Sequence, residues 1–432
     1  MVASLVALIA LSQTPVVKAG RFEMGERLKL LDVAWVATPD AARRREAVKH
    51  IAEAVTGFFG GDPPKTCQEL DLARAHLEGR VPGPEDAITA RFASPICEPG
   101  ASATLEIAWA YMPASSDEVI VAAAGTRTRL KPGVPGTLTF RVDAAVPDLK
   151  VTSEAGVLVP FRVNDRARST YLSVIRHGKE RIKALAQAAN PIAKDLGELV
   201  QRFVDQPSRM ETEMPLIQYV FLGERLEEGK VDLRDVEEIP YVKSENAVFR
   251  VAFPKSVVGK VGEPVNVVVA LHGAGGSENM FFESYGRGMA VKEALKRGWV
   301  FMAPRSSAAA PQACLNWLQN ERKLKLGKVF VMGHSMGGGI ALFSGKLEPK
   351  PAALALFAPA AGSGSKSATQ MPIYLAVGKQ EIGMLRNSVL ALMRDLSTRP
   401  DFKFEEFDPC EHLMVVADAV KPAFEFFDKY AN

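Results

Sequence analysis

The stretch VFVMGHSMGGG, residues 329–339, decides the fold of the C-terminal part of this chain. Four apolar residues typical of a buried strand lead into a Gly-His-Ser-Met-Gly turn, and glycines then open a helical stretch. A serine on so tight a strand-to-helix turn needs small neighbours, and the turn lifts its hydroxyl above the sheet. The N-terminus of the following helix faces the charge that develops there. We therefore predict that Ser335 is a nucleophile and not an incidental residue of a glycine turn.

Short apolar runs on both sides of this turn predict a parallel sheet. The runs are 265–271 (VNVVVAL), 299–303, 329–332, 352–357 and 373–377. Uninterrupted runs of this kind are typical of strands that are covered on both faces. Amphipathic stretches lie between them, at 289–296, 338–346, 385–396 and 415–427. We predict a doubly wound, mostly parallel α/β unit over residues 241–432.

The first half of the chain carries no chemical motif, and its patterns predict separate regions. Residues 38–40 (TPD) predict a helix start with Thr38 as the N-cap, and apolar residues at helical spacing follow. Between 101 and 165, at 105–111, 138–142 and 157–163, apolar and polar residues alternate as in half-buried strands. The predicted order is a helical region over 20–100, a small antiparallel β-sandwich over 101–165 and a helical connector over 166–240.

A second glycine-rich turn supplies candidate donors for an oxyanion hole. The turn 272–276 (HGAGG) ends an apolar strand, and its glycines let backbone N–H groups point at a substrate carbonyl. Deleting one such donor commonly costs about 3–4 kcal/mol of transition-state stabilisation. We expect the N–H groups of Met336 and Ala274 to be these donors. His272 and His334 are interpreted as structural residues that orient the loops.

A serine nucleophile requires a base, and the base requires an acid that fixes its tautomer. His412 follows the last predicted strand, residues 402–407, and no other histidine lies C-terminal to Ser335. Glu381 follows the strand 373–377 and is the preferred acid, with Asp408 as the rival carboxylate. The predicted triad is therefore Ser335, His412 and Glu381, in the chain order serine, acid, histidine.

Taken together, these motifs resemble those of the α/β-hydrolases. Within that superfamily they are similar to the polyhydroxybutyrate depolymerase, feruloyl esterase and phospholipase/carboxylesterase-like group. The resemblance rests on 271–282 (LHGAGGSENMFF), 302–304 (MAP), 333–339 (GHSMGGG), 378–381 (GKQE) and 411–412 (EH). It implies hydrolysis of carboxylic esters through an acyl-serine, with no cofactor and no metal, and it says nothing about residues 20–235.

This chain departs from the family pattern at two places. The acid of the family is more often Asp than Glu. Relatives in the feruloyl esterase and tannase branch carry a cysteine beside the serine that bonds one beside the histidine. Cys410 fits the second place, but Met332 and His334 leave no partner next to Ser335.

The interval between residues 357 and 373 is too short for an inserted helical lid. We therefore expect a site that is open to solvent and takes a small-molecule or polymer-attached ester. Trp317, in the loop 306–320, is a candidate wall for the substrate, with ordinary packing as the alternative.

Two other functions stay open at this point. One is a serine peptidase of the prolyl-oligopeptidase type, although no propeller repeat is visible. The other is a non-catalytic binding module with a hydrolase fold, which would be expected to carry a damaged triad. A dienelactone hydrolase is disfavoured because that group normally uses a cysteine nucleophile.

Composition excludes several classes of protein. The 432 residues are 47% hydrophobic and 24% charged, which is ordinary globular usage and unlike a disordered, collagen-like or coiled-coil chain. A net charge of +3 without a block of like charges argues against a nucleic-acid partner. No apolar run reaches 18 residues, so no ordinary membrane span is expected. Four cysteines without a CxxC pair disfavour a structural zinc site. The oligomeric state cannot be derived from the sequence.

The N-terminus predicts export. A short apolar stretch over 2–11 precedes 17–19 (VKA), which has small residues at the −3 and −1 positions of a cleavage site after Ala19. The expected location is secreted or periplasmic, with a buried first helix as the alternative. In an oxidising compartment Cys67 would pair with Cys97, and Cys314 with Cys410, although four cysteines permit three pairings.

Overall fold

The structure is a computed structural model that describes residues 17–123, 125–143, 172–211, 214–259, 262–360 and 370–432. The apolar stretch 2–11 of the predicted signal peptide and the predicted strand at 157–163 lie outside these residues. Residues 17–19 are described: Val17 forms a bridge with Trp109, and the Lys18 N–H donates to the Trp109 carbonyl at 2.7 Å. The residues just before the predicted cleavage site therefore contact the folded chain.

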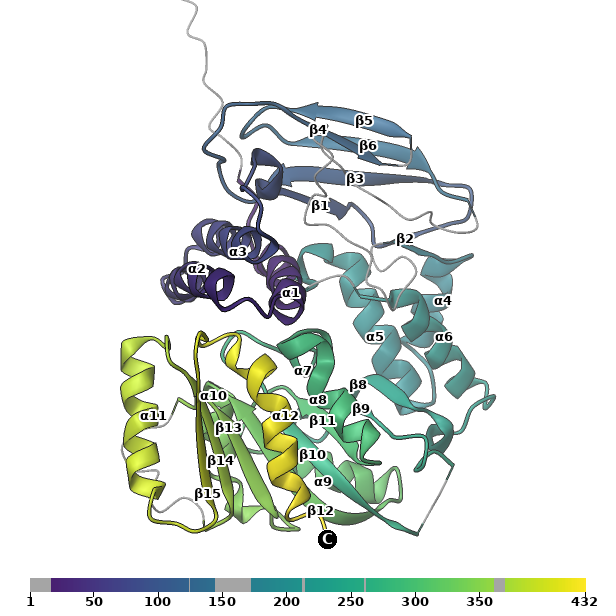
Figure 1. Ribbon diagram of the computed structural model, residues 1–432. Helices are drawn as coiled ribbons and strands as arrows, with labels where there is room; N and C mark the ends of the chain where they lie inside the picture. The colour runs from purple at the N-terminus through teal and green to yellow at the C-terminus, as the bar shows by residue number, and fades with distance from the viewer. Residues whose placement is uncertain (1–16, 124, 144–171, 212–213, 260–261, 361–369) are drawn as a thin grey trace, which may run out of the picture.

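An eight-stranded sheet forms the centre of the C-terminal part (Figure 1). Its order is β15-β14-β13-β12-β10-β11-β9-β8, and all neighbours are parallel except the pairs β9–β11 and β8–β9. This arrangement confirms the predicted doubly wound, mostly parallel sheet and is that of the α/β-hydrolase fold. The strands are β8 (Glu238–Ser244), β9 (Ala247–Ala252), β10 (Pro264–Leu271), β11 (Val300–Pro304), β12 (Lys325–His334), β13 (Ala353–Phe357), β14 (Ile373–Gly378) and β15 (Phe402–Phe407).

Alternate residues of the central strands enter two different cores. In β10, Val267 and Val269 face the first core, whereas Val268 and Ala270 face the second. Helices cover both faces, which is why these strands read as unbroken apolar runs. The first core is covered by α9 (Ala310–Asn320), α10 (Met336–Ala341), the short η4 (Ser344–Lys346) and α11 (Gly383–Leu396), and the second by α7 (Met280–Glu283), α8 (Tyr285–Lys296) and α12 (Val415–Asp428).

Three N-terminal helices precede all strands: α1 (Arg21–Ala37), α2 (Ala41–Phe59) and α3 (Pro63–Glu78). The predicted N-cap is wrong, because Thr38 follows the end of α1 and Asp40 caps α2. The Asp40 carboxylate accepts the Arg43 N–H at 2.9 Å, which satisfies an amide at the open end of the helix. Asp62 caps α3 in the same way through the Lys65 N–H, at 3.0 Å.

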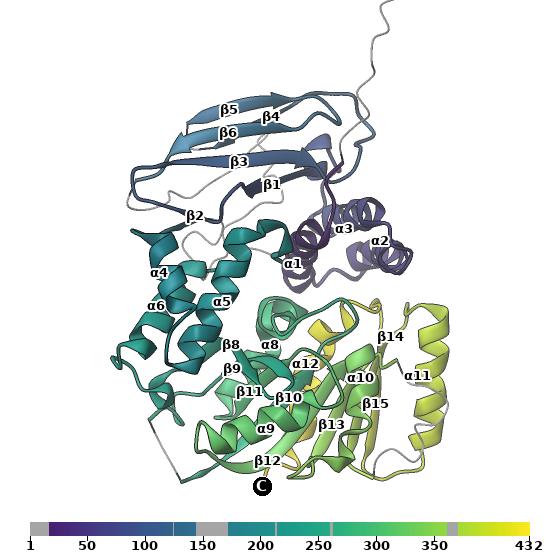
Figure 2. The same ribbon diagram turned by 180° about the vertical axis from the view of Figure 1, so that it is seen from behind.

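The three N-terminal helices share the second core with the sheet. Leu31, Trp35 and Ile51 belong to the same cluster of buried side chains as Phe281 and Val416. Figures 1 and 2 show α1, α2 and α3 between the N-terminal strands and one edge of the central sheet. The helices are thus built into the C-terminal half of the chain.

A small β-layer lies beyond these helices, around a third core. Antiparallel β1, β3 and β6 form one sheet, β4 and β5 form a hairpin, and β2 pairs with β7 in parallel. Strands β1 and β2 lie within the range 20–100 that was expected to be helical. The elements are η1 (Pro84–Ala87), β1 (Ile88–Phe92), β2 (Ile96–Cys97), β3 (Ser102–Trp109), β4 (Val119–Ala123), β5 (Thr126–Leu130), β6 (Gly136–Arg141) and β7 (Ser173–Val174).

A second helical group joins this layer to the central sheet. Helices α5 and α6 bury their apolar sides in the first core, together with residues of β8 and β9. The elements are α4 (Gly178–Leu185), α5 (Pro191–Asp205), η2 (Pro207–Arg209), α6 (Leu216–Glu227) and η3 (Leu233–Asp235). Among the residues described here, no helix combines the length and the hydropathy that a membrane span requires.

The expected disulfides are absent, since all four cysteines are free thiols. Cys314 lies in the first core and Cys410 in the second, on opposite faces of the sheet, so this pair cannot form. Cys67 is fully buried in the third core, and Cys97 lies at its edge without a bond to it. Burial raises the pKa of the Cys67 thiol to about 12, which keeps it protonated.

Candidate active site

The turn after β12 holds Ser335 in a strained conformation. Its φ of 51° and ψ of −118° are unusual for a residue with a side chain. The Ser335 N–H donates to the Phe357 carbonyl at 2.9 Å, and its own carbonyl accepts the Ala360 N–H at 2.8 Å. At Gly337 a Cβ would lie 2.1 Å from the Leu271 carbonyl oxygen. The glycine therefore allows β10 and the nucleophile turn to approach closely.

The glycine-rich turn after β10 packs directly against the serine. A Cβ on Gly273 would lie 3.2 Å from the Ser335 Cβ, and Ala274 lines the same cavity as Ser335. Within the described residues, the N–H groups of Ala274 and Met336 have no hydrogen-bond acceptor. The two predicted donors are thus unpaired amides on two turns that pack against each other, as an oxyanion hole requires.

The structure brings His412 and Glu381 into contact. His412 Nδ1 lies 2.9 Å from Glu381 Oε2, and both side chains are buried. The other Glu381 oxygen accepts the Ile382 N–H at 2.9 Å, which fixes the carboxylate. A carboxylate only accepts, so Nδ1 carries the proton, and in the neutral ring Nε2 then keeps its lone pair.

Asp408, the rival acid, is directed elsewhere. Its two oxygens accept from Lys379 Nζ at 3.1 Å and Gln380 Nε2 at 2.9 Å. These contacts lower the pKa of Asp408, with the Gln380 bond as the larger cause. The carboxylate at the histidine is therefore that of Glu381.

One cavity of about 150 Å³ connects the candidate residues. Ser335, His412 and Ala274 all line it, although Ser335 and His412 are only 5% and 4% exposed. The three positions follow β12, β15 and β10, and strands that run parallel end at one edge of the sheet. A substrate in this cavity would meet the Ser335 hydroxyl, the His412 imidazole and the turn that carries the unpaired Ala274 amide.

Hydrogen bonds through His334 join the three loops of the site. His334 Nε2 lies 2.8 Å from the His412 carbonyl oxygen, which can only accept, so Nε2 carries the proton. His334 Nδ1 therefore accepts from the Tyr285 hydroxyl, 2.7 Å away, and the Tyr285 oxygen accepts the Gly273 N–H at 3.4 Å. Burial, and secondarily the nearby His412, hold the pKa of His334 well below its ordinary value. The neutral ring positions its neighbours.

His272 has a comparable structural role in the preceding turn. Its Nδ1 lies 2.7 Å from the Gly273 carbonyl oxygen, and its Nε2 accepts the Ser306 N–H at 3.0 Å. Burial lowers the pKa of His272, which favours the neutral ring that these two bonds require. His272 thus ties the glycine-rich turn to the loop after β11.

The expectation of an uncovered site is wrong in part. The N-terminal helices roof the cavity: Met24 and Leu28 of α1, Val55 and Phe58 of α2, and Leu70 of α3 line it. No helix needs to be inserted between β13 and β14, because the cover comes from residues 21–78. The sequence shows amphipathic helices there but not where they pack.

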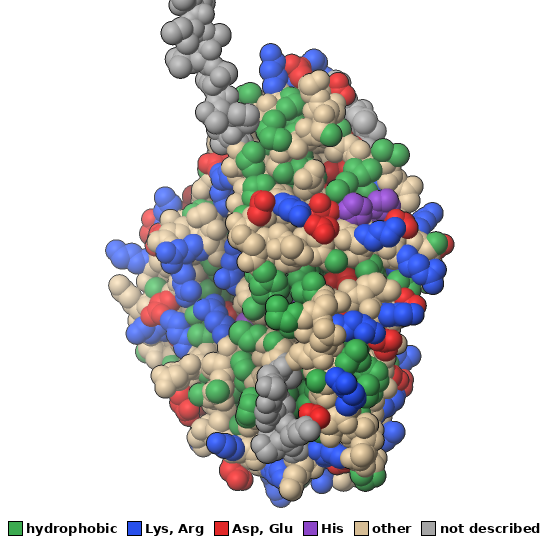
Figure 3. Space-filling model, turned by 90° about the vertical axis from the view of Figure 1, so that its left-hand side faces the viewer, with side chains coloured by type: hydrophobic (Ala, Val, Ile, Leu, Met, Phe, Trp, Pro, Cys, Tyr) green, Lys and Arg blue, Asp and Glu red, His purple; other side chains and the backbone are tan. Residues whose placement is uncertain are grey.

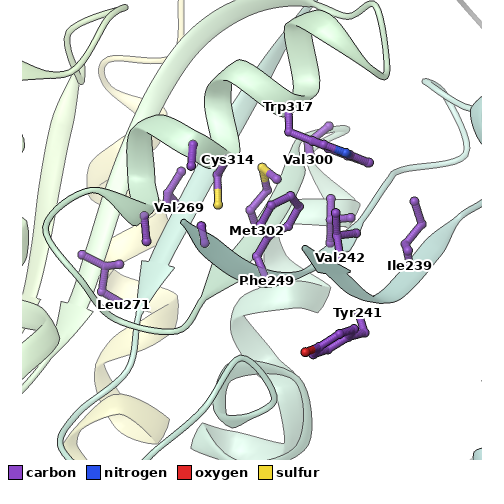
Figure 4. Close-up of a cluster of buried hydrophobic side chains, with 14 of the residues drawn as sticks. Ile239, Tyr241, Val242, Phe249, Val269, Leu271, Val300, Met302, Cys314 and Trp317 are labelled. Carbon is purple, nitrogen blue, oxygen red and sulfur yellow. The ribbon is translucent and has the colours of Figure 1, made fainter. Parts of the chain in front are cut away.

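Trp317 is not a wall of this cavity, so that prediction is also wrong. It lies on α9 in the first core, is 3% exposed, and its ring meets that of Phe249 edge-on at 5.4 Å. Figure 4 shows Trp317 beside Val300 and Met302, among other core side chains. Ordinary packing accounts for it.

Arg21, Tyr285 and Phe58 are functional candidates that the sequence did not reveal. Arg21 Nη2 donates to the carbonyls of Gly275 and Gly276, at 3.3 and 3.2 Å, and so holds the predicted oxyanion turn from α1. No motif surrounds these three residues, and their roles depend on contacts between distant segments. In the part of the chain that the structure describes, no three His, Cys, Asp or Glu side chains gather to hold a metal ion.

Comparisons with known proteins found structural similarity but no sequence match. No family model and no curated protein matches the chain. Among solved structures, an esterase of Pyrococcus furiosus is 12% identical, with 45% of this chain and 90% of that chain covered and a TM-score of 0.36. Est1E from Butyrivibrio proteoclasticus is 14% identical, with 45% and 100% covered and a TM-score of 0.34. Dienelactone hydrolase from Anabaena variabilis is 16% identical, with 46% and 100% covered and a TM-score of 0.38. The chemistry is therefore argued from the site itself.

Proposed function

We propose that the protein is a serine hydrolase that cleaves carboxylic esters through an acyl-enzyme. The observation that carries this proposal is the contact of Glu381 with His412 at the cavity that also contains the strained Ser335. A buried carboxylate that fixes the histidine tautomer leaves Nε2 as a base, which is what a serine hydroxyl needs in order to react.

The proposed cycle has two halves. His412 Nε2 removes the Ser335 proton while Oγ attacks the ester carbonyl, and the Met336 and Ala274 amides hold the oxyanion. The histidinium, stabilised by Glu381, then gives its proton to the leaving alcohol. In the second half the same base activates a water that hydrolyses the acyl-serine.

The test is labelling with a fluorophosphonate followed by peptide mapping. We expect the label on Ser335, with loss of labelling and of esterase activity in Ser335→Ala and His412→Ala. Ser344→Ala, which removes another buried serine outside the cavity, is the control and should keep both. Label on another residue, or full esterase activity in Ser335→Ala, would contradict the proposal.

The same assay separates the two competing functions. An esterase should cleave a p-nitrophenyl acyl ester and leave aminoacyl-proline amides intact, whereas a peptidase would turn over both. A binding module would cleave neither and would leave Ser335 unlabelled. We favour a small-molecule ester over a polymer-attached one, because the N-terminal helices cover the site.

We also propose that the protein is exported, on the basis of residues 1–19 alone. N-terminal sequencing of the mature chain should then begin at Gly20. A mature chain that still contains Lys18, which pairs with Glu106 in the structure, would speak against cleavage after Ala19 and export.

A further inference from the structure

We propose that helices α1, α2 and α3 form a fixed, size-limited pocket for a compact apolar group of the ester. The inference deepens the proposed function, on which it rests, by naming the class of substrate: an ester with one apolar arm of about six carbons. It assigns to residues 21–78, which carry no motif, the role of determining specificity.

The lining of the cavity is the first support. Its walls above the serine are mostly apolar side chains from all three helices, and Met280 and Leu413 add apolar surface from the C-terminal half. The charged residues at the cavity, Arg21 and Glu211, are paired with each other at 2.7 Å, and Glu211 also accepts from the Ser277 hydroxyl. Among the described residues that line it, the cavity therefore presents no unpaired charge to a ligand, which favours an apolar group.

The pocket reaches the reacting atoms. A Cβ on Gly275 would lie 2.4 Å from the Phe58 ring, so α2 rests directly on the predicted oxyanion turn. Phe58 and Phe59 are 38% and 58% exposed and lie on the open side of the cavity. In Figure 3, hydrophobic side chains gather across the middle of the face shown. A chain attached to a carbonyl at Ser335 would lie between these apolar walls.

The roof is docked too firmly to act as a swinging lid. The Asp32 carboxylate of α1 accepts the N–H groups of Gly286 and Arg287 at 2.7 Å each. Trp35 is fully buried and donates to Asp418 of α12 at 3.1 Å. Since these contacts hold α1 against α8 and α12, the side chains of the roof set the size of the pocket.

The volume sets the size that we expect for the group, although the side at Phe58 and Phe59 is exposed. A cavity of about 150 Å³ is comparable to the apolar cavity that accepts one benzene molecule. Each buried methylene contributes roughly 0.8 kcal/mol, or about fourfold in binding, as long as it fits. We expect kcat/KM to rise by about this factor per methylene up to about six carbons and to fall beyond that length.

The experiment uses two series of esters with the full chain. One series lengthens the acyl group and keeps the alcohol, and the other lengthens the alcohol and keeps acetate. The acyl chain and the alcohol chain are equally apolar. The series in which kcat/KM passes through a maximum therefore identifies the chain that enters the pocket. A flat response in both series would overturn the proposal.

Variants of the roof provide the sharper test. Val55→Phe fills the pocket and should move the optimum to two or three carbons, whereas Leu28→Ala enlarges it and should favour longer chains. The matched controls are Val36→Phe, on the exposed side of α1, and Leu31→Ala, which is buried in the core away from the cavity. Both should keep the wild-type optimum, and an unchanged optimum in folded Val55→Phe and Leu28→Ala would contradict the proposal.

A binding measurement separates this inference from the catalytic proposal. Toluene should raise the unfolding temperature of Ser335→Ala but not that of the double variant with Val55→Phe. If no ester is cleaved and Ser335 is not labelled, the catalytic proposal fails while toluene binding still reports on the pocket. If toluene stabilises neither variant or both equally, the pocket is not an apolar binding site.

Discussion

At the scale of single residues, Glu411 is a buried carboxyl beside the candidate base. It is 1% exposed, and its oxygens accept the N–H groups of Leu413 and Met414. Burial raises the pKa of Glu411 to about 8, and the nearby Glu381 adds to the rise. The group is therefore protonated at neutral pH in the folded protein and ionised in the unfolded chain.

This difference predicts how stability depends on pH. Because the folded pKa lies above the unfolded value of 4.5, the native state binds more protons between the two, and stability falls as pH rises from about 4.5 to 8. The loss is on the order of 3–5 kcal/mol. Glu411→Gln cannot ionise and should lose less stability over this range. Urea unfolding of both proteins at pH 5 and pH 9 measures this, and equal losses would refute the assignment.

Tyr285 acts through His334 and is a positioning residue. Tyr285→Phe leaves the buried His334 Nδ1 without a donor, which should cost about 1–3 kcal/mol of stability and lower kcat more than it raises KM. Tyr374→Phe is the matched control, because it removes a tyrosine bond to Glu405 on β15. The control should lose stability and keep kcat; an equal loss of kcat in both variants would mean that the effect is structural.

The sequence predicted best those site residues whose roles follow from their order along the chain. Ser335, Glu381 and His412 each follow a predicted strand that ends at the same edge of the sheet, so their proximity could be expected. The protonation of Glu411 and the tautomer of His334 could not, since both depend on burial and on partners that come from other segments. Trp317 was misassigned because an aromatic residue in a loop pattern gives no signal of the face on which it packs.

At the scale of elements, the approach of β10 to the nucleophile turn depends on Gly337. In Gly337→Ala the new Cβ would lie 2.1 Å from the Leu271 carbonyl oxygen, so backbone must move. We expect a loss of at least 10²-fold in kcat/KM, because small displacements of reacting groups are costly. Gly383→Ala, at the start of α11 with no atom within 4 Å of the new Cβ, is the control. It should keep activity and stability, and wild-type kinetics in Gly337→Ala would refute the geometric argument.

The elements of the C-terminal part were predictable for a physical reason. Strands covered on both faces must be apolar throughout, so their sequences differ clearly from the amphipathic helices between them. The N-terminal strands carry a weaker signal, and β1 and β2 fell within a range expected to be helical. The predicted start of α2 was two residues too early because Thr38 and Asp40 are both good N-cap residues. Only the structure shows which side chain accepts from a helix amide.

At the scale of the whole molecule, the N-terminal helices complete the site of the catalytic half. Asp32→Ala removes the acceptor of one buried and one partly buried N–H group and should cost about 2–4 kcal/mol of stability. It should also speed hydrogen exchange in α1 and α2. Glu53→Ala, which removes an exposed ion pair of α2 with Lys65, is the control and should leave stability nearly unchanged. Equal exchange rates in Asp32→Ala and wild type would mean that the roof is held by other contacts.

This arrangement could not be predicted because it joins residues far apart in the chain. Arg21 contacts Gly275, and Trp35 contacts Asp418, but no local pattern encodes either pairing. The expectation of an open site followed from looking for a lid where related folds insert one, between consecutive strands. In this chain the cover precedes the whole sheet.

The central claim is that Ser335 carries the acyl group during turnover. The most direct measurement is peptide mapping of the protein after acid quenching during hydrolysis of a p-nitrophenyl ester. The account predicts the acyl group on the peptide that contains Ser335, and none on that peptide in Ser335→Ala. An acyl group on another residue, or continued hydrolysis without any acylated peptide, would contradict it.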